Sequence, residues 1–159
     1  MYSEQQKWSE AEEYLKKSVQ INPNSQAKDL LAYVIGNYTN STLQDGINLY
    51  EKNSFESALT KFNDVLRKDN KNAYAYYYRG LIYDEQKKSQ LAIADYLNVL
   101  KYSNEFPIVN YLLAVDYDSL TKYKEAFSYY KSFITSYKTE DEYFNYAKSR
   151  IEELKSYAN

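Results

Sequence analysis

Residues 80–96 read GLIYDEQKKSQLAIADY, and stretches of the same pattern occur at residues 46–62 (GINLYEKNSFESALTKF) and 114–130 (AVDYDSLTKYKEAFSYY). The three stretches begin 34 residues apart. Each has a small residue first, an alanine twelve residues later and an aromatic ring at its end. Such a spacing indicates one structural unit copied in tandem, and a unit of this length buries its apolar face only by stacking on its neighbours.

Composition favours helices as the elements of this unit. The chain has 159 residues, 44% of them hydrophobic, with only three Gly and two Pro. Sheets joined by tight turns and Gly-rich phosphate loops both need more glycine than this. Within each repeat the apolar residues recur three and four positions apart, as they do on amphipathic helices. We therefore expect an all-α fold with two helices in each repeat.

The register predicts the bounds of these helices. We expect helices at residues 42–52, 55–68, 73–86, 89–102, 107–120, 123–137 and 140–157. Asn72 is a predicted N-cap, and Pro107 suits a first helical turn because it lacks an N–H group. Thr42 with Asp45, and Thr139 with Glu142, have the spacing of capping boxes. The last helix carries charged residues that suit a solubilising cap, namely Lys148, Arg150, Glu152, Glu153 and Lys155.

The 34-residue spacing is interrupted once, near the N-terminus. Ala11 and Ala58 are 47 residues apart, which leaves thirteen residues over at 26–38. The apolar residues of this stretch predict an inserted helix, and the polar residues around Gly36 predict a break after it. A single long helix through residue 52 is the alternative. The resulting division is one domain, with a partial repeat at 1–25, the inserted helix at 26–38, full repeats at 39–72, 73–106 and 107–140, and a capping helix at 141–157. Because the first repeat begins partway through, we expect a fragment of a longer protein.

The side chains present exclude most catalytic chemistry. The chain has no Cys and no His, which removes thiolate nucleophiles, imidazole bases and the commonest zinc ligands. Its net charge of −2 lacks the basic excess that nucleic-acid binding requires. No apolar run is long enough for membrane insertion. We expect no enzyme activity, no cofactor and no metal site; a cluster of Asp84, Asp116 and Asp118 is the one carboxylate set considered for a metal, and its spacing gives that idea no support.

With these features the chain resembles the tetratricopeptide repeat family, whose helix-turn-helix units stack into a right-handed superhelix. Small residues carry the resemblance where helices approach closely, at Gly46, Gly80, Ala114, Ala58, Ala92 and Ala126. Large residues carry it between the helices, at Phe62, Tyr83, Tyr96, Tyr117 and Tyr130. The family prefers proline where this chain has Asn70, Asn104 and Lys138. The resemblance implies an αα-superhelix with a C-terminal capping helix, and a noncatalytic scaffold that binds proteins or peptides.

The resemblance also implies which residues face the concave side of the superhelix. These are positions of each repeat's first helix, and most of them are aromatic or aliphatic. The candidate peptide-binding residues are Leu43, Ile47, Tyr50, Tyr74, Tyr77, Tyr78, Leu81, Asp84, Ile108, Tyr111, Leu112, Val115 and Asp118. Contiguous apolar surface and tyrosine are both typical of interaction sites. The alternative is a general use of tyrosine in this chain, which has 21 of them.

The expected partner is a protein or peptide segment, but not an acidic C-terminal tail. Family members that grip such tails present Lys, Arg and Asn on their first helices, where this chain has residues such as Leu43, Ile47 and Leu112. Asp84, Glu85, Asp116 and Asp118 would repel a carboxylate. These acids instead suggest apolar side chains and a Lys or Arg in the ligand, with an ordinary solvated helix face as the alternative.

A second hypothesis is assembly, either of two copies or with another domain. Apolar residues around Tyr2, Trp8 and Leu15 of the partial repeat, and those of the inserted helix, would be exposed and could pair through the N-terminal region, although a preceding helix of a longer protein could also cover them. A resemblance to the final repeat of periplasmic cell-envelope proteins of the family points to an envelope complex; it rests on Tyr129, Tyr130, Phe133, Ile134, Tyr137, Tyr143, Ala147, Arg150, Ile151 and Leu154. The compartment, cytoplasmic or periplasmic, stays open.

Overall fold

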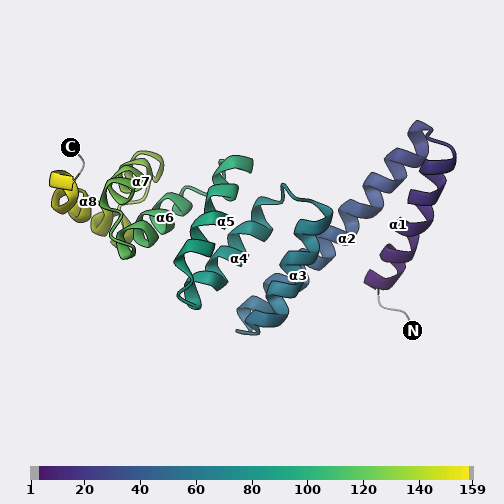
Figure 1. Ribbon diagram of the computed structural model, residues 1–159, viewed down its shortest axis with the longest axis horizontal. Coiled ribbons are helices and arrows are strands. Elements are labelled where there is room, and N and C mark those ends of the chain that lie inside the picture. Colours follow the sequence, from purple (N-terminus) through teal and green to yellow (C-terminus); the bar gives the residue numbers. More distant parts are fainter. Residues whose placement is uncertain (1–3, 158–159) are drawn as a thin grey trace. The chain divides into compact units, whose positions relative to one another are not determined.

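A computed structural model describes residues 4–157, and every regular element in that range is a helix. The predicted all-α fold is confirmed. The helices divide into two compact units, Met1–Asn70 and Lys71–Asn159 (Figure 1). None of the helices in residues 4–157 has the length and apolar character needed to cross a membrane.

The N-terminal unit contains α1 (Glu4–Ile21), α2 (Ser25–Glu51) and α3 (Phe55–Lys68). Both α1 and α3 pack against α2. Apolar residues spaced three and four apart on α3 form its buried side, which includes Ala58, Phe62 and Val65. Glu12 on α1 is 2% exposed, and its carboxylate accepts hydrogen bonds from Lys68 on α3 at 2.6 and 2.8 Å. This ion pair ties the first helix to the third.

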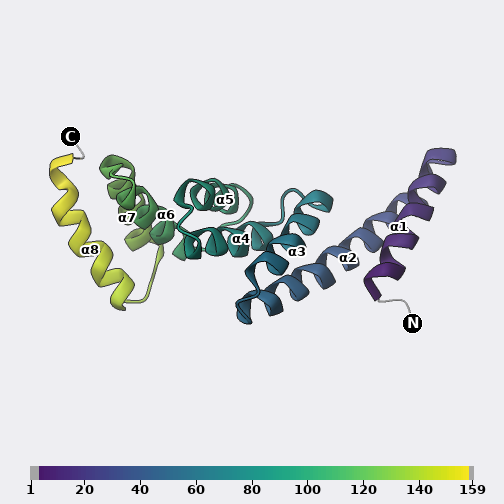
Figure 2. The same ribbon diagram turned by 60° about the horizontal axis from the view of Figure 1, so that its bottom comes forward.

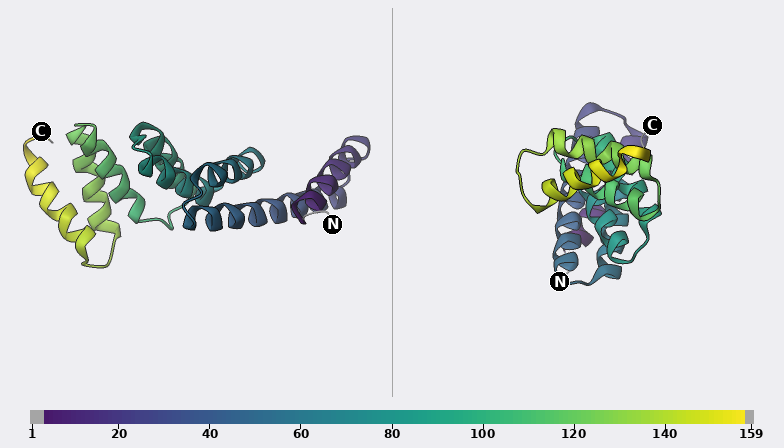
Figure 3. Two further views of the ribbon diagram at one scale, coloured as in Figure 1. Left: turned by 90° about the horizontal axis from the view of Figure 1, so that it is seen from below. Right: turned by 90° about the vertical axis from the view of Figure 1, so that its left-hand side faces the viewer.

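Helix α2 is continuous over 27 residues, as Figure 3 shows, so the expected break after residue 35 is wrong and the single-helix alternative is confirmed. The polar residues in that stretch bond to their own helix. The Thr39 hydroxyl donates to the carbonyl oxygens of Ile35 and Gly36, at 3.0 and 2.9 Å, and the Asn37 amide donates to the carbonyl of Tyr33. Thr42 lies inside α2, so it caps nothing; Asn24 is the N-cap.

The C-terminal unit contains two helical hairpins and a final helix (Figure 2). The hairpins are α4 (Ala73–Glu85) with α5 (Ser89–Tyr102), and α6 (Ile108–Ser119) with α7 (Tyr123–Ser136). The last helix, α8 (Glu142–Leu154), packs against α7 and is followed by the 3₁₀ turn η1 (Lys155–Tyr157). Most bounds agree with the sequence prediction to within one residue. Asn72 is the N-cap of α4 as predicted, whereas Asp141 caps α8 in place of the predicted Thr139.

Two apolar cores hold the C-terminal unit together. One joins α4, α5 and α6 through buried residues that include Ile93, Tyr96 and Leu113. The other joins α6, α7 and α8 through residues that include Tyr130 and Ile151. Since α6 contributes to both cores, its remaining surface is fixed relative to α4, α5 and α8.

The three hairpins turn in the same way. Asn53, Lys87 and Thr121 follow α2, α4 and α6, and their φ angles are 55°, 56° and 58°. In each turn the N–H group of the next residue donates to a carbonyl five residues back, as Lys122 does to Tyr117 at 2.9 Å. This is the Schellman arrangement, in which a left-handed residue ends the helix. The sequence repeat therefore reproduces its backbone geometry at each turn.

Candidate functional site

The predicted residues of the N-terminal unit lie on the last turns of α2. Leu43, Ile47 and Tyr50 are all half-buried. The Tyr50 ring lies 5.8 Å from the Phe55 ring of α3. These side chains therefore combine a packing role with partial exposure.

The predicted residues of α4 divide into exposed and packed side chains. Tyr74 is 47% exposed, and its ring lies against Phe106 at 4.9 Å. Tyr77 is half-buried, with its ring 5.1 Å from Phe106 and 5.4 Å from Tyr78. Leu81 packs against the core shared by α4, α5 and α6. Tyr77 and Leu81 thus help to hold the fold, which limits how far they can serve a ligand.

The predicted residues of α6 lie beside α7 and α8. Tyr111 is surrounded by four rings, those of Tyr130, Phe133, Tyr143 and Tyr146, at centroid distances of 5.2 to 6.1 Å. Ile108 packs against the core that joins α6, α7 and α8. Further along the helix, Leu112 is half-buried and Val115 is 38% exposed.

Four predicted residues line one cavity of about 560 Å³ in the C-terminal unit: Asp84, Tyr111, Leu112 and Val115. Its other lining residues come from the α4–α5 turn and from the rest of α6: Lys87, Ser89, Gln90, Asp116, Ser119 and Leu120. The cavity joins an apolar wall on α6 to polar groups at the end of α4 and the start of α5. A concave, largely apolar site with few polar groups is the usual form of a ligand pocket.

Two carboxyl groups lie in this cavity and influence each other. The Tyr96 hydroxyl donates a hydrogen bond to Oδ2 of Asp84, and the Asp84 and Asp116 carboxyl groups hydrogen-bond to each other. Oδ1 of Asp84 and Oδ2 of Asp116 are buried, and no group in residues 4–157 other than this pair donates to them. Burial raises the pKa of Asp84 above its usual range. Burial, together with the nearby Asp84 carboxylate, raises the pKa of Asp116 to about 7. Near neutral pH the pair therefore retains a proton that isolated carboxyl groups would lose.

The repeat register also distinguishes Asp116, which the sequence indicated only as one of several acids on neighbouring helices. Asp116 is 6% exposed and lies 34 residues after Ile82, which is fully buried. An acid at a position where the preceding repeat buries isoleucine is costly unless it serves a structural or binding role.

Asp118 lies outside this cavity and faces α8. Its two carboxylate oxygens accept hydrogen bonds from Nε and Nη2 of Arg150, both at 2.8 Å. Arg150, expected on the solvated face of the capping helix, is therefore half-buried against α6. In residues 4–157 no three acidic side chains gather in a way that could hold a metal ion.

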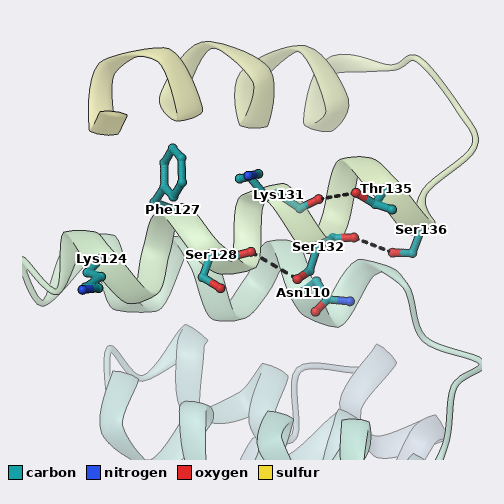
Figure 4. A pocket seen from close by; sticks show the side chains of 8 residues that line it. All are labelled: Asn110, Lys124, Phe127, Ser128, Lys131, Ser132, Thr135 and Ser136. Carbon is teal, nitrogen blue, oxygen red and sulfur yellow. Dashed lines mark hydrogen bonds between the residues drawn. The ribbon is translucent and has the colours of Figure 1, made fainter. Parts of the chain in front are cut away.

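A second cavity, of about 660 Å³, lies along α7 and contains none of the predicted residues (Figure 4). Its hydroxyl groups bond to their own helix: Ser132 donates to the carbonyl of Ser128, Thr135 to that of Lys131 and Ser136 to that of Ser132. Since these three donors are already used within α7, the polar side chains that remain along the cavity are those of Asn110, Lys124, Ser128 and Lys131.

At the N-terminus, the expected exposed residues agree with the observed ones only in the inserted stretch 26–38, where Leu30 and Tyr33 are exposed. Leu15 is buried, and Trp8 is half-buried with its ring 6.5 Å from Tyr33. Tyr2 lies outside the described residues. The exposed large apolar residues of α1 and α2 are Tyr14, Ile21, Leu30 and Tyr33, at 74, 85, 49 and 62%.

The sequence model of the tetratricopeptide repeat matches residues 43–107. That segment, 65 of the 159 residues, is similar to the tetratricopeptide repeat family. The matched segment spans the end of α2, all of α3, the hairpin α4–α5 and the α5–α6 connection up to Pro107. No curated protein matches the sequence.

Solved tetratricopeptide repeat (TPR) structures share the fold. The Arabidopsis OM64 TPR domain aligns with a TM-score of 0.64 at 16% identity, over 74% of this chain and 94% of that one. The first TPR of Spaghetti (RPAP3), solved with the HSP90 peptide SRMEEVD, gives 0.64 at 13% identity, over 75% and 91%. MamA gives 0.59 at 18% identity, over 99% and 92%. These likenesses confirm an all-α TPR fold.

Proposed function

We propose that this chain is a noncatalytic scaffold that binds a peptide or protein segment, and that the cavity between α4, α5 and α6 is part of its binding surface. The observation that carries the proposal is that Tyr111, Leu112 and Val115, singled out by their place in the repeat, line one cavity with Asp84. The TPR structure of Spaghetti (RPAP3) holds a peptide, which gives a precedent for this fold.

Exposed apolar side chains on the first helices supply the binding energy. Tyr74 and Val115 are 47 and 38% exposed, and Leu112 is half-buried. Burial of one such side chain contributes about 1.5–3 kcal/mol, so two or three contacts support roughly micromolar affinity once association costs are subtracted. Tyr77 and Tyr111 are less suitable as test positions because their rings pack inside the fold.

The acids in the cavity disfavour an acidic ligand. Asp84 and Asp116 both face the space where a bound segment would lie, and no Lys or Arg stands at the predicted first-helix positions. A tail ending in carboxylates would meet like charge there. The preferred partner is therefore an apolar segment without net negative charge at this site.

Panning a library of random dodecapeptides displayed on phage against the folded chain tests the proposal. Enriched peptides are synthesised and their affinity is measured by fluorescence anisotropy. Val115→Lys is expected to weaken binding about tenfold or more, because it places a charge in the apolar wall. Leu97→Lys is the matched control, since Leu97 is 39% exposed on α5 and outside the cavity. Equal affinities for the two variants would remove this cavity from the binding surface.

A second candidate function is assembly through the N-terminal helices. Tyr14, Ile21 and Tyr33 are 74, 85 and 62% exposed on α1 and α2, which is unusual for large apolar residues. Sedimentation velocity at increasing concentration tests self-association, and Ile21→Lys with Tyr33→Lys should abolish any dimer. A monomer at every concentration would exclude pairing of two copies through these helices.

A further inference from the structure

We propose that the cavity lined by Tyr111, Leu112 and Val115 receives a lysine or arginine side chain of the bound segment, whose cation lies against the carboxyl groups of Asp84 and Asp116. This inference rests on the proposed function and names the chemistry that the site selects. It follows from the buried carboxyl pair, whose facing oxygens have no donor in the described part of the chain except the proton they share, and from the apolar wall that leads to them.

The oxygens that lose their donor when the carboxyl pair is ionised point to a ligand that donates hydrogen bonds. Asp116 is 6% exposed, and its Oδ2 has no donor among the described residues other than the proton it shares with Asp84. Asp84 uses Oδ2 for the Tyr96 hydroxyl, and its Oδ1 likewise has only that shared proton. Buried polar atoms in native structures normally have partners, and a carboxylate pays a large desolvation penalty without one. An ammonium or guanidinium group would supply both the donors and the opposite charge.

The shape of the cavity fits a long basic side chain better than a metal ion. Leu112, Val115 and Leu120 offer apolar surface to the aliphatic stem of lysine or arginine, while the charged head reaches the carboxyl pair. Calcium requires about six to eight oxygen ligands, and no group of three or more acidic side chains forms a metal site in residues 4–157. A side-chain cation needs fewer oxygens.

No cation of the described residues is paired with the two carboxyl groups. Glu85 and Lys87, at the end of α4, are exposed. No ion pair joins Lys87 to Asp84 or Asp116 in the described part of the chain. Tyr96 on α5 and Tyr111 on α6 both have a pKa raised by burial, so both stay neutral near pH 7. The group with a pKa near neutrality at this site is therefore Asp116.

Binding of the cation is coupled to loss of a proton. In the free chain the carboxyl pair retains a proton near neutral pH, because burial and mutual repulsion raise the pKa of Asp116 to about 7. A cation competes with that proton, so affinity must increase with pH until the pair is ionised. We expect affinity for a basic ligand to rise about tenfold or more between pH 5.5 and pH 8.

The test uses the full chain labelled with ¹⁵N and three amino-acid probes: N-acetyl-lysine amide, N-acetyl-arginine amide and the neutral N-acetyl-norleucine amide. Shifts of the Tyr111, Val115 and Leu120 amide signals report binding. Lysine or arginine amide should shift them in a saturable way, more strongly at pH 8 than at pH 5.5, and norleucine amide and calcium chloride should not. Which of the two basic probes binds more tightly distinguishes lysine from arginine as the preferred side chain.

Two variants separate the site from general electrostatics. Asp116→Asn should weaken binding of the basic probe about tenfold and abolish its pH dependence. Glu85→Gln removes the same charge from an exposed position of α4 and should leave the affinity within about twofold. Equal effects of the two variants, or equal binding of norleucine amide, would overturn the proposal.

The outcomes also separate this inference from the proposed function. If library peptides bind through Val115 but contain no basic residue and show no pH dependence, the scaffold stands and the basic subsite is wrong. If basic probes bind while no peptide is enriched, the subsite stands and the scaffold proposal fails.

Discussion

Tyr96 lies so close to Gly80 that a Cβ atom on residue 80 would be 2.6 Å from Cε1 of the tyrosine ring. The ring is fully buried, and its hydroxyl is held by the Asp84 carboxylate, so it has little room to move. Gly80 is thus required by the close approach of α4 and α5. The same relationship joins Gly46 and Phe62 in the preceding repeat, also at 2.6 Å.

Gly80→Ala is therefore expected to destabilise the chain, by about 1–3 kcal/mol, because the added methyl group overpacks the contact with Tyr96. Gly36→Ala is the matched control, since a Cβ atom there meets nothing within 4 Å. In mid-helix that change should stabilise by about 0.5–1 kcal/mol. Guanidinium unfolding followed by circular dichroism measures both. If the two substitutions changed the free energy of unfolding in the same direction, the requirement for glycine at position 80 would be contradicted.

The periodic sequence predicted α3 and α5 to the residue, because a repeated pattern of buried positions fixes where each helix must pack. It failed at α2. Gly36, Asn37 and Thr39 are breakers by propensity, but their helix satisfies the Asn37 and Thr39 side chains through its own carbonyl oxygens, and Gly36 needs no turn. Local preference was outweighed by the continuous packing of α1 and α3 on α2.

The candidate site was only partly predictable for a related reason. Register placed Tyr111, Leu112 and Val115 on one helix face, and they line one cavity. Register could not tell that Tyr111 is enclosed by rings of α7 and α8, since those contacts depend on the final helix. Nor did it reveal the pairing of Asp84 with Asp116, which come from two different repeats.

The hairpin turns predict an unequal response to glycine. Thr121 is β-branched and holds a φ of 58°, a strained conformation for such a residue. Thr121→Gly should relieve this strain and stabilise the chain by about 0.5–1 kcal/mol. Asn53→Gly, at the equivalent turn, should be nearly neutral because asparagine tolerates a left-handed conformation. Thermal unfolding of both variants provides the comparison, and a loss of stability at Thr121 would refute the prediction.

Removal of one charge from the buried ion pair of Arg79 and Asp95 should lower the stability of the chain strongly. Nε and Nη2 of Arg79 donate to the Asp95 carboxylate at 2.7 Å each, and Asp95 is 3% exposed. Arg79→Ala leaves this buried carboxylate without its cation and should cost about 3–5 kcal/mol. Arg67→Ala removes an exposed partner of Asp64 and should cost less than about 1 kcal/mol. The two are compared by chemical denaturation, and similar losses would mean that the Arg79 pair is solvated.

Because Asp116 has a raised pKa, the stability of the chain should depend on pH. The isosteric variant Asp116→Asn should lack this dependence. The pKa of Asp116 is raised to about 7 in the folded chain, from an ordinary value of 3.8 for an aspartate. The folded state therefore binds more protons than the unfolded state between these values, so this group lowers stability as pH rises through that interval, and the loss is complete above about pH 7. Asp116→Asn cannot ionise. Its free energy of unfolding, relative to the parent chain, should increase by about 1–3 kcal/mol between pH 5 and pH 8, since one pKa unit corresponds to about 1.4 kcal/mol.

Urea unfolding at several pH values measures this difference, with Glu85→Gln as the control because Glu85 is exposed on the same helix as Asp84. The control's free energy of unfolding should follow that of the parent chain across the range. If the Asp116→Asn difference is the same at pH 5 and pH 8, then Asp116 ionises in the folded chain as it does in the unfolded one. The carboxyl pair would then hold no proton for a cation to displace, and a basic probe would bind the cavity equally well at both pH values.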